Sequence, residues 1–337
     1  TNLPVYQALQ PQNAGAVDGF VARISPTGSL RDWTYLRGSA SDATRDIKLT
    51  ASGEAWVVSG TSSTNAPLIN PYWPLNSGGD DFLLQRINAT GTALTYSSDF
   101  GGSGDEHPIG LILDATENVY VVGTTTSTNL PKAGSLQPSL SGAQDGVILK
   151  LDPTGTNLLF SSYFGGSNVD TILDAQLEAE GKIWVAGDTL STNFPTVLPS
   201  QPASGGLRDA FLARIDTCSY EVSSANQIFQ STGGNGTVHI ITTPECSWAA
   251  ATSAPWISFT SPSSGVGNGS VDFSVASNTA LAATSGSITV GGQTITIDEA
   301  GTAASLTAIS PASGGAGTAV AVALTGSNFA AGMTVTS

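Results

Sequence analysis

Four aspartates recur at regular intervals in the first part of the sequence, and a basic residue follows each of them five positions later. The aspartates are Asp18, Asp81, Asp145 and Asp209, and the basic residues are Arg23, Arg86, Lys150 and Arg214. Repeated carboxylates could line a ring that holds a metal ion, and repeated cations could line one that holds an anionic ligand. Side chains five positions apart on a strand point to opposite faces, so one such pair does not make a compact site. We therefore expect each aspartate to accept backbone N–H bonds from the loop before its strand, and each cation to reach an acceptor on the neighbouring repeat.

The segment Gly104–His107 contains two carboxylates and an imidazole, which are all competent metal ligands. The corresponding segments, 41–44 and 168–171, do not keep these residue types, which favours a solvated turn over a metal site. His107 and His239 are the two histidines of the sequence, and no acidic residue is close to His239. A Ser-His-Asp or Cys-His nucleophile is therefore hard to build. We expect no catalytic, cofactor or metal site, and no enzymatic activity.

Two tryptophans are candidates for stacking against a sugar ring. Trp73 lies between prolines in a segment without strand pattern, which predicts an exposed loop position. Trp256 follows Pro255 and precedes an apolar stretch, so packing in a core is the alternative interpretation for this residue. Both are candidate glycan contacts.

The two cysteines, Cys218 and Cys246, lie in one short segment. An even pair in a lysine-poor chain rich in Gly, Ser and Thr favours a disulfide and an oxidising compartment over two free buried thiols.

The composition limits the partners. The sequence has 26 acidic and 11 basic residues, and its formal charge of -15 would repel nucleic acids and anionic membranes. No stretch approaches the roughly 20 apolar residues that a membrane helix needs, so we expect no membrane insertion. Only 11% of the residues are charged, which leaves uncharged polar groups to hydrate the surface and indicates an extracellular protein. We expect a partner that is protein or glycan.

The elements that must position these residues repeat with a fixed period, which is the mark of a repeat architecture. A Thr-Asn-x-Pro segment marks each period, at residues 1–4, 64–67, 128–131 and 192–195. Within a period, short apolar runs alternate with Gly, Asn, Asp and Pro, which predicts strands and turns. In the third period we expect strands at 145–151, 157–164, 171–177 and 182–187. Four short antiparallel strands per unit predict an all-β fold with propeller-type blades.

Five motifs recur in the same order within residues 1–216. Examples are Gly101–Asp105, Asn118–Gly123, Ser127–Pro131, Phe160–Gly166 and Asp209–Asp216. This order resembles the bacterial SBBP β-propeller repeats, a resemblance that implies four-stranded blades. The first unit departs from the pattern, because it has Leu36-Arg37-Gly38 where the others have Phe-Gly-Gly.

After Asp216 the period ends, and short alternating strands predict an antiparallel sandwich. Residues 217–301, with Cys-Ser-Tyr, Cys-Ser-Trp and a terminal Gln-Thr-Ile-Thr-Ile run, resemble a BACON-type immunoglobulin-like domain, which implies carbohydrate association. Residues 302–337 resemble the start of an IPT/TIG domain. Such a domain needs roughly 80 to 100 residues, so this segment is incomplete.

The strand pattern begins and ends within a unit and amounts to about three and a half blades, whereas closed propellers carry roughly four to eight. Such an array leaves apolar faces and unpaired strand edges in water. One explanation is that the sequence is a piece of a longer protein. The other is that neighbouring chains complete each other, by closing two half-propellers or by adding a strand, and a head-to-tail contact would build a filament.

Together these features predict a secreted or cell-surface structural or adhesive scaffold that binds protein or glycan and self-assembles. The alternative function is a carbohydrate-binding accessory module of a secreted protein.

Overall fold

The computed structural model describes residues 8–74, 76–178, 181–218, 220–223, 226–243, 246–313, 315, 317 and 321–329. All its regular elements are β-strands, which confirms the predicted all-β class. The chain divides into two compact units, Thr1–Ser219 and Tyr220–Ser337. No described part of the chain forms a helix that is long and apolar enough to cross a membrane.

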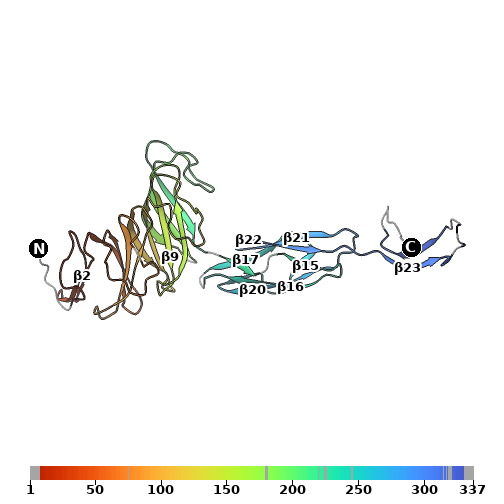
Figure 1. Cartoon of the computed structure of the whole chain (residues 1–337), viewed down its shortest axis with the longest axis horizontal. Coiled ribbons are helices and arrows are strands. Elements are labelled where there is room, and N and C mark those ends of the chain that lie inside the picture. Colours follow the sequence, from red (N-terminus) through yellow and green to blue (C-terminus); the bar gives the residue numbers. More distant parts are fainter. Residues whose placement is uncertain are drawn as a thin grey trace. The chain divides into compact units, whose positions relative to one another are not determined.

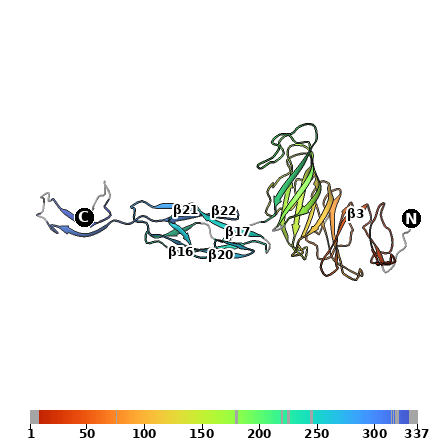
Figure 2. The same cartoon turned by 180° about the vertical axis from the view of Figure 1, so that it is seen from behind.

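The first unit contains four antiparallel sheets that follow one another in chain order (Figures 1 and 2). An initial pair is formed by β1 (Gly19–Ile24) and β2 (Leu30–Leu36). The first complete sheet is made of β3 (Asp42–Leu49), β4 (Ala55–Thr61), β5 (Asp81–Ile87) and β6 (Leu94–Phe100). The second is made of β7 (Glu106–Leu113), β8 (Val119–Thr125), β9 (Asp145–Leu151) and β10 (Leu158–Phe164). The last has three strands, β11 (Asp170–Leu177), β12 (Lys182–Thr189) and β13 (Asp209–Asp216).

Each complete sheet is a meander in which the strands pair in sequence order. The turn from the third to the fourth strand contains a glycine with positive φ, at +74° for Gly91 and +77° for Gly155. This left-handed conformation explains why glycine recurs there, because other residues adopt it at a steric cost. The connection from the second to the third strand is much longer, at 62–80 in the first complete sheet and 126–144 in the second. It carries the Thr-Asn-x-Pro segment; the first copy of that segment, residues 1–4, lies outside the described residues.

Consecutive sheets pack through the first strand of each sheet, since β3 contacts β7 and β7 contacts β11. Alternating apolar residues on both faces of the complete sheets fill the layers between them, with Trp56, Tyr96 and Phe160 among the largest buried side chains. The central sheets are therefore covered on both faces. The array as described has two complete sheets, one pair and one three-stranded sheet, compared with the predicted three and a half units.

The second unit is a sandwich of two sheets. One sheet has the order β14-β16-β20-β18 and the other the order β15-β22-β21-β17-β19. The bounds are β14 (Glu221–Ser223), β15 (Gln227–Phe229), β16 (Gly234–Ile241), β17 (Ser247–Thr252), β18 (Ile257–Phe259), β19 (Ser264–Val266), β20 (Gly269–Val275), β21 (Thr284–Val290) and β22 (Gln293–Glu299). Inward-facing residues such as Val238, Phe273 and Ile297 form its core.

Two further strands, β23 (Ser305–Ser310) and β24 (Ala323–Ser327), pair with each other. Every residue of both strands is exposed. Several residues of the segment predicted to start an IPT/TIG domain, among them 330–337, lie outside the described part of the chain.

Candidate functional site

The repeated aspartates lie at the point where the long loop enters the third strand of each sheet. Each carboxylate accepts the backbone N–H of the residue four positions earlier, which holds the end of the loop against the strand. The bonds are Ala14 to Asp18 (2.8 Å), Ser77 to Asp81 (2.9 Å), Ser141 to Asp145 (2.9 Å) and Gly205 to Asp209 (2.8 Å). The loop-tethering role expected for these residues is thus present in all four repeats.

A second set of repeated carboxylates is absent from the predicted site residues. Asp42, Glu106 and Asp170 begin the first strands β3, β7 and β11, and their side chains are fully buried. Each accepts the N–H of a glycine four positions earlier, at 2.6 to 2.7 Å. Their positions are evenly spaced along the chain, a regularity that the sequence contains but that the changing residue type conceals.

The repeated Thr-x-Ser-Thr-Asn segment, which overlaps the Thr-Asn-x-Pro segment, forms hydrogen bonds with this second set of carboxylates and with the turn before them. In the second complete sheet the Thr125 hydroxyl donates to Glu106 Oε1 at 2.6 Å. Ser127 Oγ and Asn129 Oδ1 then accept the N–H groups of Gly104 and Ser103, both at 2.8 Å. The segment that marks the period in the sequence therefore fixes the turn that leads into the first strand.

The two sets of carboxylates meet where one sheet joins the next. The N–H of Glu106 donates to the carbonyl of Asp80 at 2.6 Å, which places Glu106 beside Asp81 of the preceding sheet. The first glycine of the Gly-Gly pair lies between the carboxylates. A Cβ atom on Gly165 would be 2.6 Å from Asp145 Oδ1 and 2.7 Å from Asp170 Oδ2, so only glycine fits there.

These paired carboxyl groups are chemically unusual, because one oxygen of each aspartate on the third strand, Asp81 Oδ1 and Asp145 Oδ1, is buried and has no hydrogen-bond partner. Burial raises the pKa of Asp81 to about 7, the Ser77 N–H lowers it, and Glu106 and Asp99 raise it. Burial and the neighbouring Asp170 likewise raise the pKa of Asp145, against the hydrogen bond from Ser141. Burial and the neighbouring carboxylate thus both disfavour ionisation of Asp81 and of Asp145. The described residues contain no group of three or more His, Cys, Asp or Glu side chains that could hold a metal ion.

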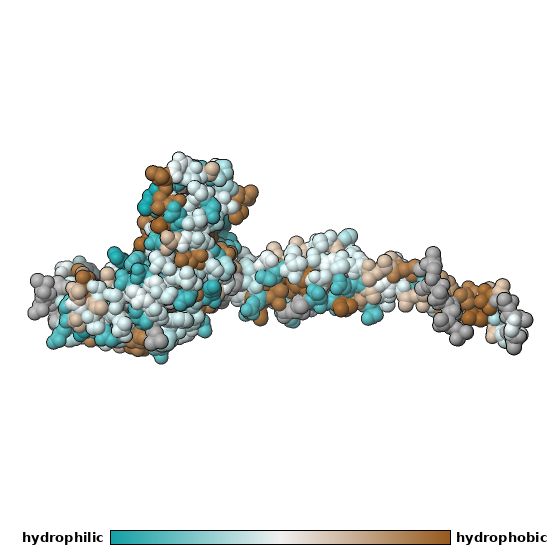
Figure 3. Space-filling view, turned by 45° about the horizontal axis from the view of Figure 1, so that its top comes forward, coloured by the Kyte–Doolittle hydropathy of each residue, from teal (hydrophilic) through white to brown (hydrophobic). Residues whose placement is uncertain are grey.

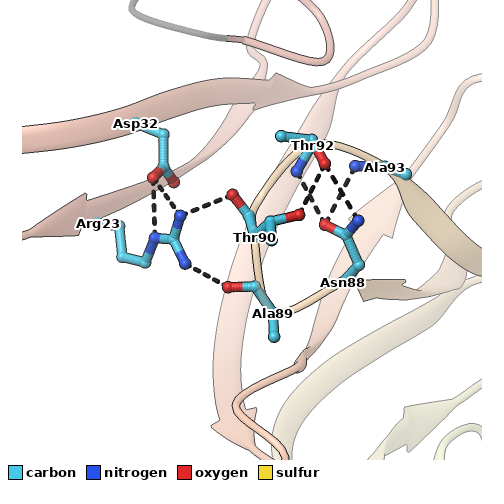
Figure 4. Close-up of polar contacts among 7 residues, drawn as sticks. All are labelled: Arg23, Asp32, Asn88, Ala89, Thr90, Thr92 and Ala93. Carbon is cyan, nitrogen blue, oxygen red and sulfur yellow. Dashed lines mark hydrogen bonds and ion pairs between the residues drawn. The ribbon is translucent and has the colours of Figure 1, made fainter.

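Two of the four basic residues, Arg23 and Arg86, form a second joint, that is, a second set of contacts between consecutive sheets, at the other end of the third strand. The Arg23 guanidinium donates to the carbonyls of Ala89 and Thr90 in the β5–β6 turn of the next sheet, with 2.6 Å to Thr90, while Asp32 of its own sheet accepts from Nε at 2.8 Å (Figure 4). Asn88 orders the receiving turn by accepting the N–H of Thr92 at 2.8 Å.

Arg86 repeats this arrangement one sheet further along. It donates to the carbonyl of Pro153 in the β9–β10 turn at 3.0 Å and to Glu54 at 2.5 Å, and its guanidinium lies 5.4 Å from the Trp56 ring. Lys150 is buried with its Nζ 5.2 Å from the Tyr120 ring, and Arg214 pairs with Glu178 at 2.8 Å.

The predicted glycan contacts belong to different units. The Trp73 backbone donates to Ser98 Oγ at 2.9 Å, and its half-buried indole approaches Ser77 Oγ at 3.4 Å. Trp256 is half-buried and lines a shallow pocket of 410 Å³ together with Asn278 and Glu299. The Glu299 carboxylate accepts the N–H of Asn278 at 2.9 Å, so part of this polar lining is already paired within the protein.

The remaining candidates are the two cysteines and His107. Both cysteines, Cys218 and Cys246, are disulfide-bonded. His107 is half-exposed, and its Nδ1 lies 3.9 Å from Asp80 Oδ2.

No family model matches the chain, and no curated protein matches it. Among solved structures, a Bacteroides ovatus GH5 xyloglucanase in complex with a XXXG heptasaccharide is similar at 24% identity over 24% of this chain and 19% of that chain, with a TM-score of 0.22. Domains 1-6 of the surface layer protein SbsC are similar at 8% identity over 90% of this chain and 41% of that chain, with a TM-score of 0.21. The chain thus spans less than half the length of either structure.

Proposed function

We propose that this protein is a secreted or cell-surface structural or adhesive scaffold without catalytic activity. In this proposal residues 1–216 are an SBBP-type repeat array, residues 217–301 a BACON-like sandwich, and residues 302–337 the start of an IPT/TIG-like segment. The observation that supports it best is the recurrence of the same two joints between consecutive sheets. The carboxyl pair recurs at Asp81–Glu106 and at Asp145–Asp170, and the arginine joint recurs at Arg23 and Arg86.

Joints that recur once per repeat serve the stacking of sheets, whereas a catalytic site is a single constellation of residues. The scaffold would bind protein partners, including further copies of itself, and head-to-tail contacts would extend it into a filament. The test is size-exclusion chromatography with light scattering over a range of concentrations, followed by negative-stain imaging. We expect concentration-dependent association and linear assemblies. A folded monomer at all concentrations would refute the self-assembly.

The second candidate function is carbohydrate binding by an accessory module. The half-buried Trp256 at the 410 Å³ pocket favours it, since tryptophan rings stack on sugars and polar groups lie beside this one. A glycan array with the wild type and the Trp256→Ala and Trp73→Ala variants tests this function. Trp184→Ala is a matched control, because Trp184 is 39% exposed on β12. Absence of any glycan signal, or equal loss in the control, would eliminate it.

A further inference from the structure

The third strand of the last sheet, β13, has one side open. Its counterparts β5 and β9 are each paired on both sides, with β6 and β10 as the outer partners. β13 pairs with β12, and no described strand pairs with its other edge. Leu212 on β13 is 68% exposed, whereas its equivalents Leu84 and Ile148 are buried against the following sheet, which is absent beside β13 among the described residues.

The fourth strand of a complete sheet also binds the long loop of the same sheet. The backbone of Ser97 exchanges two hydrogen bonds with Ile69, at 2.9 and 3.0 Å, and Ser161 donates to the carbonyl of Ala133 at 2.7 Å. Ser162 Oγ in turn accepts the N–H of Gln137 at 2.9 Å. The strand is thus held between the third strand on one side and the loop on the other.

The corresponding loop in the last sheet is shaped for the same contact but lacks the strand. Val197 is the equivalent of Ile69 and Ala133, and it is 91% exposed. The next residue, Leu198, has φ of +49°, which matches +48° for Asn70 and +55° for Gly134 at the same position of the other loops. A leucine adopts this left-handed conformation only at a cost, so the loop is ordered for binding in advance.

Two views of the structure agree with this arrangement. The green loop between β12 and β13 extends away from the rest of the first unit (Figure 1), and hydrophobic surface is gathered on the projecting part of this unit (Figure 3). Exposed hydrophobic residues of the loop are Val197, Leu198 and Leu207. Exposed apolar side chains beside an unpaired strand edge are typical of a surface that receives another strand.

We propose that β13 and the loop at 190–208 form an acceptor slot for one extended strand of the β6 and β10 type, supplied by another polypeptide with the same repeat. The pattern that fits is Leu-x-aromatic-Ser-Ser-x-Phe-Gly-Gly, as in residues 94–102. The second serine pairs with the position of Leu212, as Ser98 does with Leu84 and Ser162 with Ile148. The first serine pairs with Val197, and the incoming strand completes the sheet by β-strand addition. This inference rests on the proposed self-association and names the surface that carries it.

The experiment uses a fluorescein-labelled peptide with the sequence of residues 156–167 and the full chain at submicromolar concentration. Fluorescence anisotropy should give saturable binding. A peptide with Ser161→Pro and Ser162→Pro should not bind, because proline has no N–H to donate to the ladder. Val197→Pro in the protein removes the N–H whose equivalent on Ile69 donates to the carbonyl of Ser97, and it should raise the Kd of the native peptide by about tenfold or more.

Ile228→Lys provides the control for substitution of an exposed residue, because Ile228 is 77% exposed in the other unit. It should change the Kd by less than about twofold. Absence of saturable binding, equal binding of the proline peptide, or an unchanged Kd in Val197→Pro would overturn the proposal. If the chain self-associates and Val197→Pro leaves that association intact, the slot is refuted and the scaffold function stands. If the peptide binds and the chain stays monomeric, the slot stands and self-assembly is refuted.

Discussion

Replacement of Asp99 by asparagine should remove part of the pH dependence of the stability of the first unit. Asp99 lies near the end of β6 and is 3% exposed, and its Oδ1 has no hydrogen-bond partner. Tyr35 and Tyr163 occupy the same position in the neighbouring sheets, and the Tyr163 hydroxyl accepts the N–H of Leu130 at 3.1 Å. Asp99 therefore places an ionisable group where the repeat otherwise has an aromatic ring.

Burial raises the pKa of Asp99 from 3.8 to about 7, and the charge of Asp42 adds to this rise. Below about pH 4 the carboxyl group is protonated in both the folded and the unfolded chain, and it has no effect on the pH dependence. As the pH rises to about 7, the unfolded chain releases the proton and the folded chain keeps it, so the free energy of unfolding falls by up to about 1.4 kcal/mol per pH unit. Above about pH 7 the loss levels off at roughly 4 kcal/mol.

Urea unfolding of the full chain between about pH 4 and pH 8.5 measures this effect, and hydrogen-exchange mass spectrometry identifies the transition of the first unit. The stability of Asp99→Asn minus that of the wild type should increase by roughly 4 kcal/mol from about pH 4 to pH 8. Asp174→Asn on β11 is the control, because Asp174 is exposed. Parallel pH profiles for the wild type and Asp99→Asn would show that the folded chain does not retain this proton and would refute the reasoning.

Three further predictions concern the joints and the cysteines. Gly165→Ala should lower the free energy of unfolding by about 2 to 4 kcal/mol, because a Cβ atom at this position collides with both carboxylates. Gly206→Ala is the control, since the space at its Cβ is open, and it should change this free energy by less than about 0.5 kcal/mol in urea unfolding. Arg86→Met should destabilise the first unit by about 2 kcal/mol, because the Arg86 side chain donates a hydrogen bond to the next sheet. Arg214→Met should destabilise it by less than about 1 kcal/mol, because Arg214 forms a half-exposed ion pair. Equal losses of stability in thermal unfolding would contradict this prediction. Intact mass measured without reductant should reveal no thiol that alkylates, whereas two alkylated cysteines would disprove the disulfide and the oxidising compartment inferred from it.

The strands of the array could be predicted from the sequence because their pattern is local. Apolar runs bounded by Gly and Asp predict β9 and β13 with the bounds that the structure has, 145–151 and 209–216. The tethering aspartates could be predicted from the sequence for the same reason, since each contacts the loop only four positions away. The spacing alone was enough to indicate them.

The second carboxylate of each joint could not be predicted from the sequence in this way. Glu106 is distant from Asp81 in the sequence and lies in another sheet, so the pair exists only when the sheets stack. Its residue type also changes between Asp and Glu along the array, which conceals the constant spacing of these positions. Comparing position 106 alone with its equivalents 42 and 170, and not the whole segment 104–107, would have found it.

The joints also show that the environment of a repeated residue depends on whether a following sheet is present. Inside the array, burial against the next sheet raises the pKa of Asp81 and of Asp145. At the last sheet the Ser204 hydroxyl and the Gly205 N–H lower the pKa of Asp209, the same residue of the same motif. Docking of a further strand and sheet onto β13 would bury Asp209 and reverse the direction of this shift. Assembly at this end would therefore be linked to proton uptake, and the residues that stabilise the interior of the array become interface residues at its edge.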